Sequence, residues 1–311
     1  MADAVLSILR AGPHVTLQDG GRRGMMRFGV PASGPMDRKA LIVANTALGN
    51  APGAAGIEVS LGGLEAECTS GAVTLAAAGG GFVIEVDGQR LGAWQVFTLR
   101  AGQRLVVRPG PWGSWMCLAV AGQIERPEWL GSLATHGPTG LGGGRLLAGE
   151  TLTITQTRLL PDRALPCPAS ARPRHLLHAV AGPQDRFFSP QALADLQEGP
   201  FRLTSAYDRM GVRLAGPPLV PTGALSIPSE PILRGSIQVS GDGVATLLLA
   251  DHQTTGGYPK IATVINDDLD GFVQCRPNQS VRFQLIAPQT AITIARQRAA
   301  SFQRYLAQFA S

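Results

Sequence analysis

Lysine is nearly absent from this sequence of 311 residues, since Lys39 and Lys260 are the only lysines among 27 basic residues. Aromatic residues make up 5% of the chain and charged residues 16%. The arginines are scattered, and the formal net charge is only +5. A nucleic-acid-binding surface usually combines a basic stripe with stacking aromatic side chains. The composition therefore argues against a nucleic-acid partner and favours a modestly basic globular protein.

The sequence also lacks a long uninterrupted apolar run. The uncharged stretch from Cys68 to Ile84 is broken by Ser70 and by the glycines at 79–81, so we do not expect it to span a membrane. Near the N-terminus, Asp3 and Arg10 flank a segment without the continuous apolar region of a secretion signal. We therefore expect a cytoplasmic protein that does not associate with membranes.

Cysteine is scarce, and none of the cysteines has CxxC spacing. Each lies in or beside an apolar segment, which predicts buried free thiols in a reducing compartment: Cys68, Cys117, Cys167 and Cys275. His175 and His178 are three positions apart, which places them on opposite faces of a strand. No other histidine or cysteine completes a ligand set, so we predict that this chain binds no metal.

Turn-forming residues are abundant, with 39 glycines and 23 prolines, while 44% of the residues are hydrophobic. This combination predicts a mainly β protein with short strands and a few helices. Pro35 and Asp37 indicate the start of a helix that Gly49 and Asn50 end. Ser189 is the expected cap of a second helix over residues 190–197, and the apolar spacing over residues 292–309 predicts an amphipathic helix packed on the second half. Strands are expected at Val5–Ile8, Ile57–Leu61, Val73–Ala78, Phe82–Val86, Trp94–Leu99, Leu105–Val107 and Met116–Val120.

The chain is expected to contain two related β-rich domains. Residues 160–174 include four prolines and few apolar residues, as is typical of a linker. AGQRLVV at residues 101–107 has a counterpart in PNQSVRF at residues 277–283, and LQDGGRRG has a weaker one in SAYDRMG. We predict an N-terminal β-barrel-like domain over residues 1–160 and a C-terminal β-barrel domain with a terminal helix over residues 161–311.

The stretch DHQTTGGYPK, Asp251 to Lys260, lies between two apolar runs that read as strands. It combines a carboxylate, an imidazole, amide and hydroxyl groups, two glycines and an ammonium group, more than a simple hairpin needs. One interpretation is a polar loop on the rim of a barrel. The other is a site for a small polar substrate. The glycine-rich GLGGGR, by contrast, lacks the following lysine of a phosphate-binding loop.

Several motifs occur together in one order: TLQDGGRRG, SGPMDRKALIVANTALGN, IEVSLGG, CLAVAGQI, AYDRMGVRL, GSIQV and DHQTTGGYPKIATVI. With these motifs the chain resembles the family of allophanate hydrolase subunit 2, Kip antagonist and biotin-dependent carboxyltransferase proteins, from Ser7 to about Phe283. Ser240 stands where the family commonly has proline. The resemblance implies tandem cyclophilin-like β-barrel domains.

The resemblance also implies a function that depends on partners. Many free-standing members resemble the C-type component of an ATP-dependent 5-oxoprolinase, which opens 5-oxoproline to glutamate. That component works with an A-type partner and with a B-type partner of the allophanate hydrolase subunit 1 or Kip inhibitor type. ATP would act in the complex, at a site that the sequence does not assign to this chain.

Two alternative functions follow from the same resemblance. One is the carboxyltransferase component of a urea carboxylase, which would use biotin. The other is a non-catalytic regulator that antagonises an inhibitor of a histidine kinase.

The catalytic chemistries require a polarised amide carbonyl and groups that orient the substrate or move a proton. The residue types indicate Asp208, Arg209, Asp251 and Lys260 as catalytic candidates. The substrate-binding candidates are Gln18, Asp19, Arg22, Gln253, Thr254, Thr255, Gly256, Gly257 and Tyr258. Arg22 and Arg209 have an alternative structural role, as ion-pair partners of turn aspartates. We expect the loop from Gln253 to Lys260 to line one pocket with Asp208 and Arg209, and Gly256 to leave room for a substrate.

Overall fold

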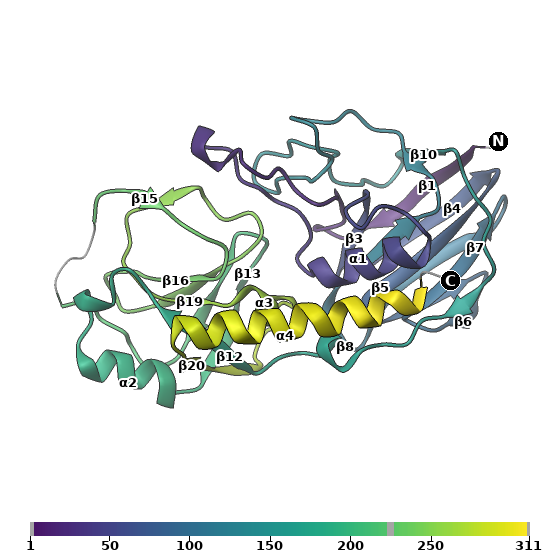
Figure 1. Cartoon of the computed structure of the whole chain (residues 1–311). Helices are drawn as coiled ribbons and strands as arrows, with labels where there is room; N and C mark the ends of the chain where they lie inside the picture. The colour runs from purple at the N-terminus through teal and green to yellow at the C-terminus, as the bar shows by residue number, and fades with distance from the viewer. Residues whose placement is uncertain (1–2, 223–226, 310–311) are drawn as a thin grey trace. The chain divides into compact units, whose positions relative to one another are not determined.

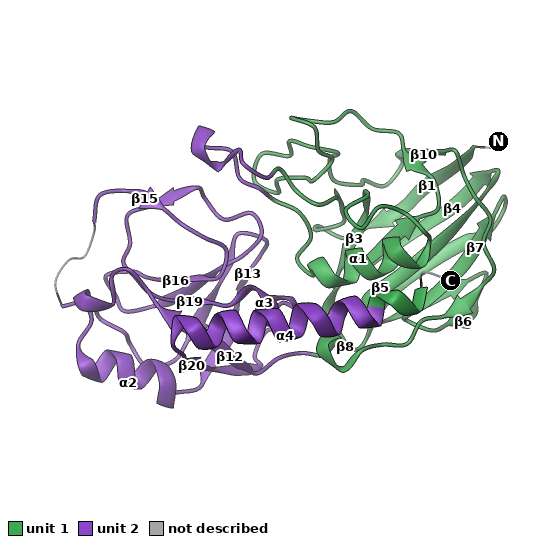
Figure 2. Ribbon diagram, viewed as in Figure 1, with its two compact units in different colours: residues 1–22, 33–172, 306–311 green, residues 23–32, 173–305 purple. Residues whose placement is uncertain are grey.

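The chain forms two compact units, each built on its own β-sheet (Figure 1, Figure 2). The structure is a computed structural model that describes residues 3–222 and 227–309. Unit 1 comprises residues 1–22, 33–172 and 306–311, and unit 2 comprises residues 23–32 and 173–305. Most of the regular secondary structure is β-strand, which confirms the predicted fold class.

Unit 1 contains an eleven-stranded sheet whose strand pairs are all antiparallel. The main path runs β11-β7-β5-β8-β4-β1-β10-β9, and β2, β3 and β6 pair beside it. The strands are β1 (Ala4–Ala11), β2 (Thr16–Gln18), β3 (Gly56–Ser60), β4 (Leu64–Ser70), β5 (Ala72–Val86), β6 (Gln89–Leu91), β7 (Gln95–Arg100), β8 (Arg104–Val120), β9 (Gln123–Ile124), β10 (Thr151–Thr155) and β11 (Arg163–Ala164). Alternate residues such as Leu6 and Ile8 of β1 fill the core.

Two strands of this sheet are longer than the sequence patterns predict. The expected strands Val73–Ala78 and Phe82–Val86 are joined in β5, which continues through the glycines at 79–81 with register shifts against β8. Gly79 has a φ of 123°, and a Cβ atom there would lie 2.7 Å from the Cα atom of Met116. The glycines therefore allow β5 to approach β8 closely and bend, where the prediction treated them as a turn. The expected strands at 105–107 and 116–120 are likewise joined in β8.

Helix α1 (Arg38–Ala47) begins and ends as the sequence predicts. The side chain of Asp37, the N-cap residue, accepts a hydrogen bond from the backbone N–H of Ala40 at 2.9 Å. Gly49 follows the helix with a φ of 69°, a conformation that glycine adopts without steric cost. Leu41 and Val43 are among the buried residues of the helix.

Unit 2 contains a closed barrel with the strand order β12-β19-β16-β17-β14-β13-β20. The ring is closed by the parallel pair β12–β20, so these strands have no free edge in the barrel. Its strands are β12 (Leu176–Ala181), β13 (Phe201–Tyr207), β14 (Gly211–Ala215), β16 (Ser236–Val239), β17 (Ala245–Leu248), β19 (Lys260–Val264) and β20 (Ser280–Leu285). A separate pair joins β15 (Glu230–Pro231) to β18 (Thr255–Gly256).

The helices α2 (Pro190–Glu198), α3 (Asn266–Phe272) and α4 (Pro288–Leu306) follow strands of this barrel in sequence. Ser189 caps α2 as predicted, since its hydroxyl accepts a hydrogen bond from the N–H of Ala192 at 3.1 Å. Short 3-10 turns occur as η1 (Met26–Phe28), η2 (Ala169–Ala171), η3 (Asp185–Phe187) and η4 (Ala307–Phe309). Of the residues in α4, only Leu306 is buried, so the expectation of a helix face buried on the second half is wrong over most of its length. An ion pair of 2.5 Å between Arg298 and the buried Asp268 holds α4 to the rest of unit 2.

The predicted linker contributes to unit 1, because β11 within it pairs with β7 and places Arg163 opposite Val96. Unit 1 continues to residue 172 before unit 2 resumes at 173, and the domain boundary at residue 160 stays a prediction. Cys68, Cys117 and Cys275 are buried free thiols as expected, while Cys167 is half-buried. No helix in residues 3–222 and 227–309 is both long and apolar enough to cross a membrane.

Candidate functional site

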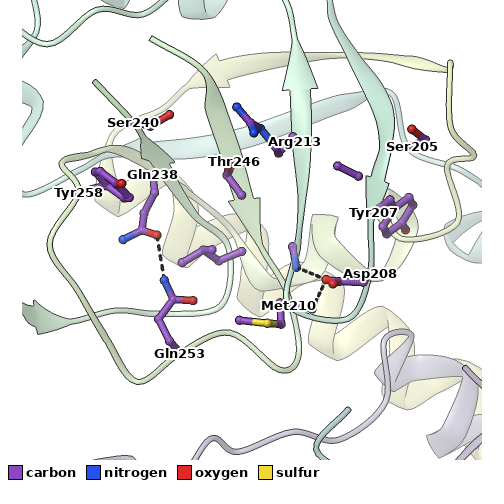
Figure 3. Close-up of a pocket in the computed structure, with 13 residues that line it drawn as sticks. Ser205, Tyr207, Asp208, Met210, Arg213, Gln238, Ser240, Thr246, Gln253 and Tyr258 are labelled. Atoms are coloured by element: carbon purple, nitrogen blue, oxygen red, sulfur yellow. Dashed lines mark hydrogen bonds between the residues drawn. The ribbon is translucent and has the colours of Figure 1, made fainter. Parts of the chain in front are cut away.

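A pocket of about 560 Å³ lies on the outer face of the unit 2 barrel (Figure 3). Its floor follows the strand register, because Arg213 of β14 is opposite Thr246 of β17, which is opposite Gln238 of β16. The residues between these positions, such as Val212 and Leu247, are buried on the other face of the sheet. The lining residues are Ser205, Ala206, Tyr207, Asp208, Met210, Gly211, Arg213, Gln238, Ser240, Thr246, Leu248, Gln253 and Tyr258. This volume is within the range of about 300–1,000 Å³ typical of small-molecule sites.

One side of the pocket is the turn between β13 and β14. The Oδ1 atom of Asp208 accepts hydrogen bonds from the backbone N–H groups of Met210 at 2.7 Å and Gly211 at 3.2 Å. This aspartate turn fixes the carboxylate and leaves Oδ2 as an acceptor. On the adjoining strand, the hydroxyl of Tyr207 donates to the carbonyl of Val273 at 2.8 Å, which orients the ring at the edge of the pocket.

The other side comes from the stretch that the sequence singles out, the segment between β17 and β19. Gln253 donates from Nε2 to Oε1 of Gln238 at 3.2 Å, and the two side chains face each other in Figure 3. Tyr258 is 49% exposed and lines the pocket near Ser240. The Nε2 atom of Gln238 is buried and has no hydrogen-bond partner among the described residues. The structure therefore brings Asp208, Gln253 and Tyr258 together, as the sequence predicts.

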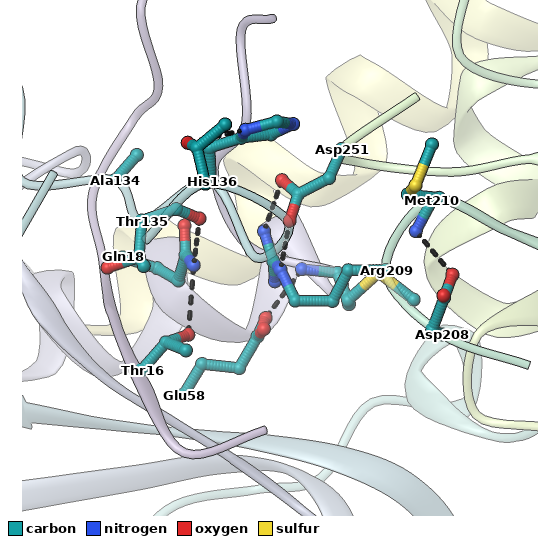
Figure 4. Close-up of polar contacts among 12 residues, drawn as sticks. Thr16, Gln18, Glu58, Ala134, Thr135, His136, Asp208, Arg209, Met210 and Asp251 are labelled. Atoms are coloured by element: carbon teal, nitrogen blue, oxygen red, sulfur yellow. Dashed lines mark hydrogen bonds and ion pairs between the residues drawn. The ribbon is translucent and has the colours of Figure 1, made fainter. Parts of the chain in front are cut away.

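Arg209 and Asp251 are beneath this site rather than in its lining. The guanidinium of Arg209, 2% exposed, donates to both carboxylate oxygens of the fully buried Asp251, at 2.8 and 3.0 Å (Figure 4). The backbone N–H of Asp251 also donates to the carbonyl of Arg209 at 2.8 Å. The prediction that Arg209 lines the pocket is wrong. The pair ties the turn that carries Asp208 to the segment that carries Gln253.

Lys260 is also outside the pocket. Its Nζ atom lies 2.5 Å from Oε1 of Glu230, its side chain is 3% exposed, and its backbone N–H donates to Oε1 of Gln184 at 3.2 Å. The hydrogen bond from Lys260 lowers the pKa of the Glu230 carboxyl below its usual range. Lys260 thus stabilises the start of β19 through an ion pair, and nothing in its position requires contact with a substrate.

The middle of the segment pairs with residues 227–232. The backbone N–H of Ile232 donates to the carbonyl of Thr254 at 3.2 Å, and that of Ile227 donates to the carbonyl of Gly257 at 2.8 Å. Thr255 and Gly256 form β18 opposite β15. A Cβ atom on Gly256 would lie 2.5 Å from Nε2 of Gln238 and 3.1 Å from Cδ1 of Ile232. The expectation that Gly256 leaves room for a substrate is therefore wrong, because side chains of the protein fill that space. None of Thr254, Thr255, Gly256 or Gly257 lines the pocket.

The candidates of the first motif, Gln18, Asp19 and Arg22, belong to unit 1 and hold its loop at residues 129–135. Nε2 of Gln18 donates to the Thr16 hydroxyl at 2.9 Å and to the carbonyl of Thr135 at 3.0 Å (Figure 4). Asp19 accepts from the Ser132 hydroxyl and the Leu133 N–H, both at 2.7 Å. The Arg22 guanidinium donates to the carbonyl of Trp129 at 2.9 Å and lies 4.6 Å from the centre of its ring. Their substrate-binding role stays a prediction.

The sequence interpretation missed several residues of the pocket floor, notably Arg213, Gln238 and Thr246. Each is a polar residue at an alternating position in an otherwise apolar strand. That pattern indicates an outward-facing side chain. The signal was present, but it does not say which outward-facing residues of different strands meet. Among the described residues there is no group of three His, Cys, Asp or Glu side chains that could hold a metal ion.

Comparison with known proteins identifies the family. The sequence profile of the family described as "Carboxyltransferase domain, subdomain A and B" matches residues 28–285. The chain belongs to this family. A carboxyltransferase-domain relative in Escherichia coli K12, the C-type subunit of 5-oxoprolinase, is 34% identical over 310 residues and matches 98% of each chain. The corresponding C-type 5-oxoprolinase subunit of Haemophilus influenzae is 32% identical over 295 residues, 94% of each chain.

More distant carboxyltransferase-domain relatives belong to larger proteins. A putative urea carboxylase of Emericella nidulans is 29% identical over 90% of this chain, which corresponds to 24% of that protein. Among solved structures, TTHA0988 superimposes with a TM-score of 0.82 at 33% identity, over 90% of this chain and 55% of its own. The K. lactis urea amidolyase gives a TM-score of 0.88 over 98% of this chain, but at 22% identity this likeness shows the fold alone.

Proposed function

We propose that this chain is the C-type subunit of an ATP-dependent 5-oxoprolinase, an amidohydrolase that opens the lactam of 5-oxoproline to give glutamate. The observation that carries the proposal is the correspondence with the C-type 5-oxoprolinase subunit of Escherichia coli, 34% identical over 98% of both chains. A relative of the same length provides no surplus domain to which the activity of that protein could belong. The chain acts with partners of the A type and the B type, and ATP is consumed in the assembled complex.

The pocket on the barrel is the proposed place for the substrate. Opening a lactam requires acceptors for its N–H group and donors for its carbonyl oxygen, in which negative charge develops. Asp208 presents an oriented carboxylate, and Thr246 and Tyr258 present hydroxyl groups at the same pocket. These groups bind and orient an amide. Asp208 is also placed to hold a proton at the lactam nitrogen as the C–N bond breaks.

The urea carboxylase relative is the basis of a second candidate function, the carboxyltransferase component of a biotin-dependent system. The same pocket would then bind urea, another planar molecule with N–H donors and a carbonyl acceptor. Biotin would carry the carboxyl group. This chain corresponds to only 24% of that relative, so the remaining parts would have to come from separate proteins.

Reconstitution distinguishes the two functions. The untagged chain is combined with its cognate A-type and B-type partners, and glutamate release from 5-oxoproline is measured with and without ATP. We expect a stable complex in size-exclusion chromatography and ATP-dependent glutamate release that none of the separate proteins shows. ATP-dependent carboxylation of urea in place of glutamate release would favour the second function. Full glutamate release by the isolated chain would contradict the need for partners.

A further inference from the structure

The charged groups of the pocket are one carboxylate and one guanidinium. Of the thirteen lining residues, only Asp208 and Arg213 carry charge, and they are at the turn and on the adjoining strand β14. The remaining polar groups are neutral hydroxyls and amides. A ligand that matches this lining therefore has an N–H donor for the carboxylate, an anionic group for the guanidinium and neutral polar groups between them.

The carboxylate of Asp208 is oriented before any ligand arrives. Its Oδ1 atom already accepts from two backbone N–H groups, at 2.7 and 3.2 Å. Oδ2 makes no hydrogen bond or ion pair with other residues in the described parts of the chain. A fixed carboxylate with one available oxygen favours a single N–H donor from a ligand, because little side-chain freedom is lost on binding.

Arg213 is held only weakly by the protein. Its guanidinium lies 3.6 Å from Asp242, and the two side chains are 54% and 59% exposed. Ion pairs between exposed side chains contribute little to stability and exchange readily with solvent. A ligand carboxylate can replace Asp242 and form two parallel hydrogen bonds with the guanidinium.

The spacing of the two groups suits a small molecule. Gly211, whose N–H binds Asp208, and Arg213 are two residues apart on one face of β14, a separation of about 7 Å along a strand. The long Arg213 side chain can turn back over that distance. Thr246, opposite Arg213 in the register, and Tyr258 have hydroxyl groups that make no hydrogen bond within the described residues. They are available to a carbonyl oxygen.

We propose that Asp208 and Arg213 together make this pocket selective for a lactam that carries a carboxylate, with Asp208 accepting from the ring N–H and Arg213 binding the carboxylate. This assignment rests on the proposed function and identifies the residue that determines the substrate class. 5-Oxoproline has both groups on neighbouring atoms of one ring. Urea is neutral and leaves Arg213 without a counter-ion, so the pocket rejects urea by charge.

The test compares ligands that differ in one group. Binding to the full chain is measured by calorimetry or ligand-observed NMR for 5-oxoproline, its neutral carboxamide, 2-pyrrolidinone and urea. We expect 5-oxoproline to bind about tenfold to a hundredfold more tightly than the neutral ligands, as for a charge-assisted hydrogen-bonded contact. Arg213→Gln is expected to weaken 5-oxoproline to the level of its carboxamide and to leave the carboxamide unchanged. Asp208→Asn keeps the turn acceptor but weakens both lactams.

Arg202→Gln is the matched control, since Arg202 is an exposed arginine of β13 outside the pocket that donates to Asn278. It should bind all ligands as the wild type does. Equal binding of 5-oxoproline and its carboxamide, an Arg213→Gln variant that keeps the preference, or no binding of 5-oxoproline either alone or in the assembled complex overturns the assignment. Charge-selective binding without glutamate release by the reconstituted complex leaves the assignment standing and contradicts the proposed function instead.

Discussion

At the scale of single residues, Arg209 and Arg213 show how different two arginines of one motif can be. Both occur in DRMGVR, yet Arg209 is 2% exposed and bound to Asp251, while the Arg213 side chain is 54% exposed. The sequence correctly predicts that this motif contributes to the pocket. It does not predict which arginine lines it, because the alternation of strand residues begins only at Gly211 and the turn before it follows no period.

We expect Arg209→Ala to lower the free energy of unfolding by about 3–5 kcal/mol, the usual effect of removing one partner of a buried ion pair. The variant leaves the buried Asp251 carboxylate without two hydrogen bonds of 2.8 and 3.0 Å. Urea denaturation of the wild type, Arg209→Ala and the exposed control Arg202→Ala measures this effect. If the two variants unfold at the same urea concentration, the pair does not hold the turn to the segment at Asp251.

We expect Gly256→Ala to destabilise the fold by about 1–3 kcal/mol, the typical cost of overpacking. The added Cβ atom would meet Nε2 of Gln238 at 2.5 Å, and that side chain is buried and bonded to Gln253. Gly92→Ala is the matched control, because its nearest contact would be the side chain of Gln95 at 3.4 Å. A Gly256→Ala protein as stable as the Gly92→Ala protein would show that Gln238 moves aside freely.

At the scale of elements, the segment between β17 and β19 combines two roles that its sequence does not separate. Thr254 and Gly257 use their backbone to pair with residues 227–232, whereas Gln253 and Tyr258 line the pocket. Its partner strand β15 has only the two residues Glu230 and Pro231. A pairing this short, with proline in it, has no local pattern from which to predict it. The flanking strands, by contrast, are long apolar runs and were predicted correctly.

The same segment is expected to make the fold sensitive to mild acid. Burial lowers the pKa of His252 below its ordinary value of 6.5, and the ring is 5% exposed. The folded protein therefore binds fewer protons at this site than the unfolded chain, so stability is complete above pH about 6.5 and falls as the pH drops below it. The denaturation midpoint of the wild type should decrease between pH about 7.5 and 5.5 by more than that of His252→Gln.

His175→Gln is the control for this measurement, because His175 is exposed at the edge of the same barrel and its Nδ1 atom lies 2.9 Å from the carbonyl of Ser280. This variant should show the pH dependence of the wild type. If His252→Gln loses stability with falling pH as steeply as the wild type, the acid sensitivity arises elsewhere in the chain.

At the scale of the whole molecule, the four tryptophans are Trp94, Trp112, Trp115 and Trp129, all in unit 1. The three tyrosines, Tyr207, Tyr258 and Tyr305, are all in unit 2. Tryptophan fluorescence therefore reports on the sheet of unit 1, whereas far-ultraviolet circular dichroism reports on both units. This division allows the predicted two-domain organisation to be tested without cutting the chain.

We expect the two units to unfold in separate transitions, because each has its own hydrophobic core and the chain exceeds the size at which two-state unfolding is usual. Arg209→Ala changes unit 2 alone, so it should shift one transition seen by circular dichroism to lower urea while the midpoint of tryptophan fluorescence stays that of the wild type. Equal shifts of both signals would mean that the units unfold as one cooperative structure. In that case a change in the barrel would also destabilise the sheet that holds Gln18 and Asp19, and activity losses in unit 2 variants would have to be corrected for the fraction of folded protein.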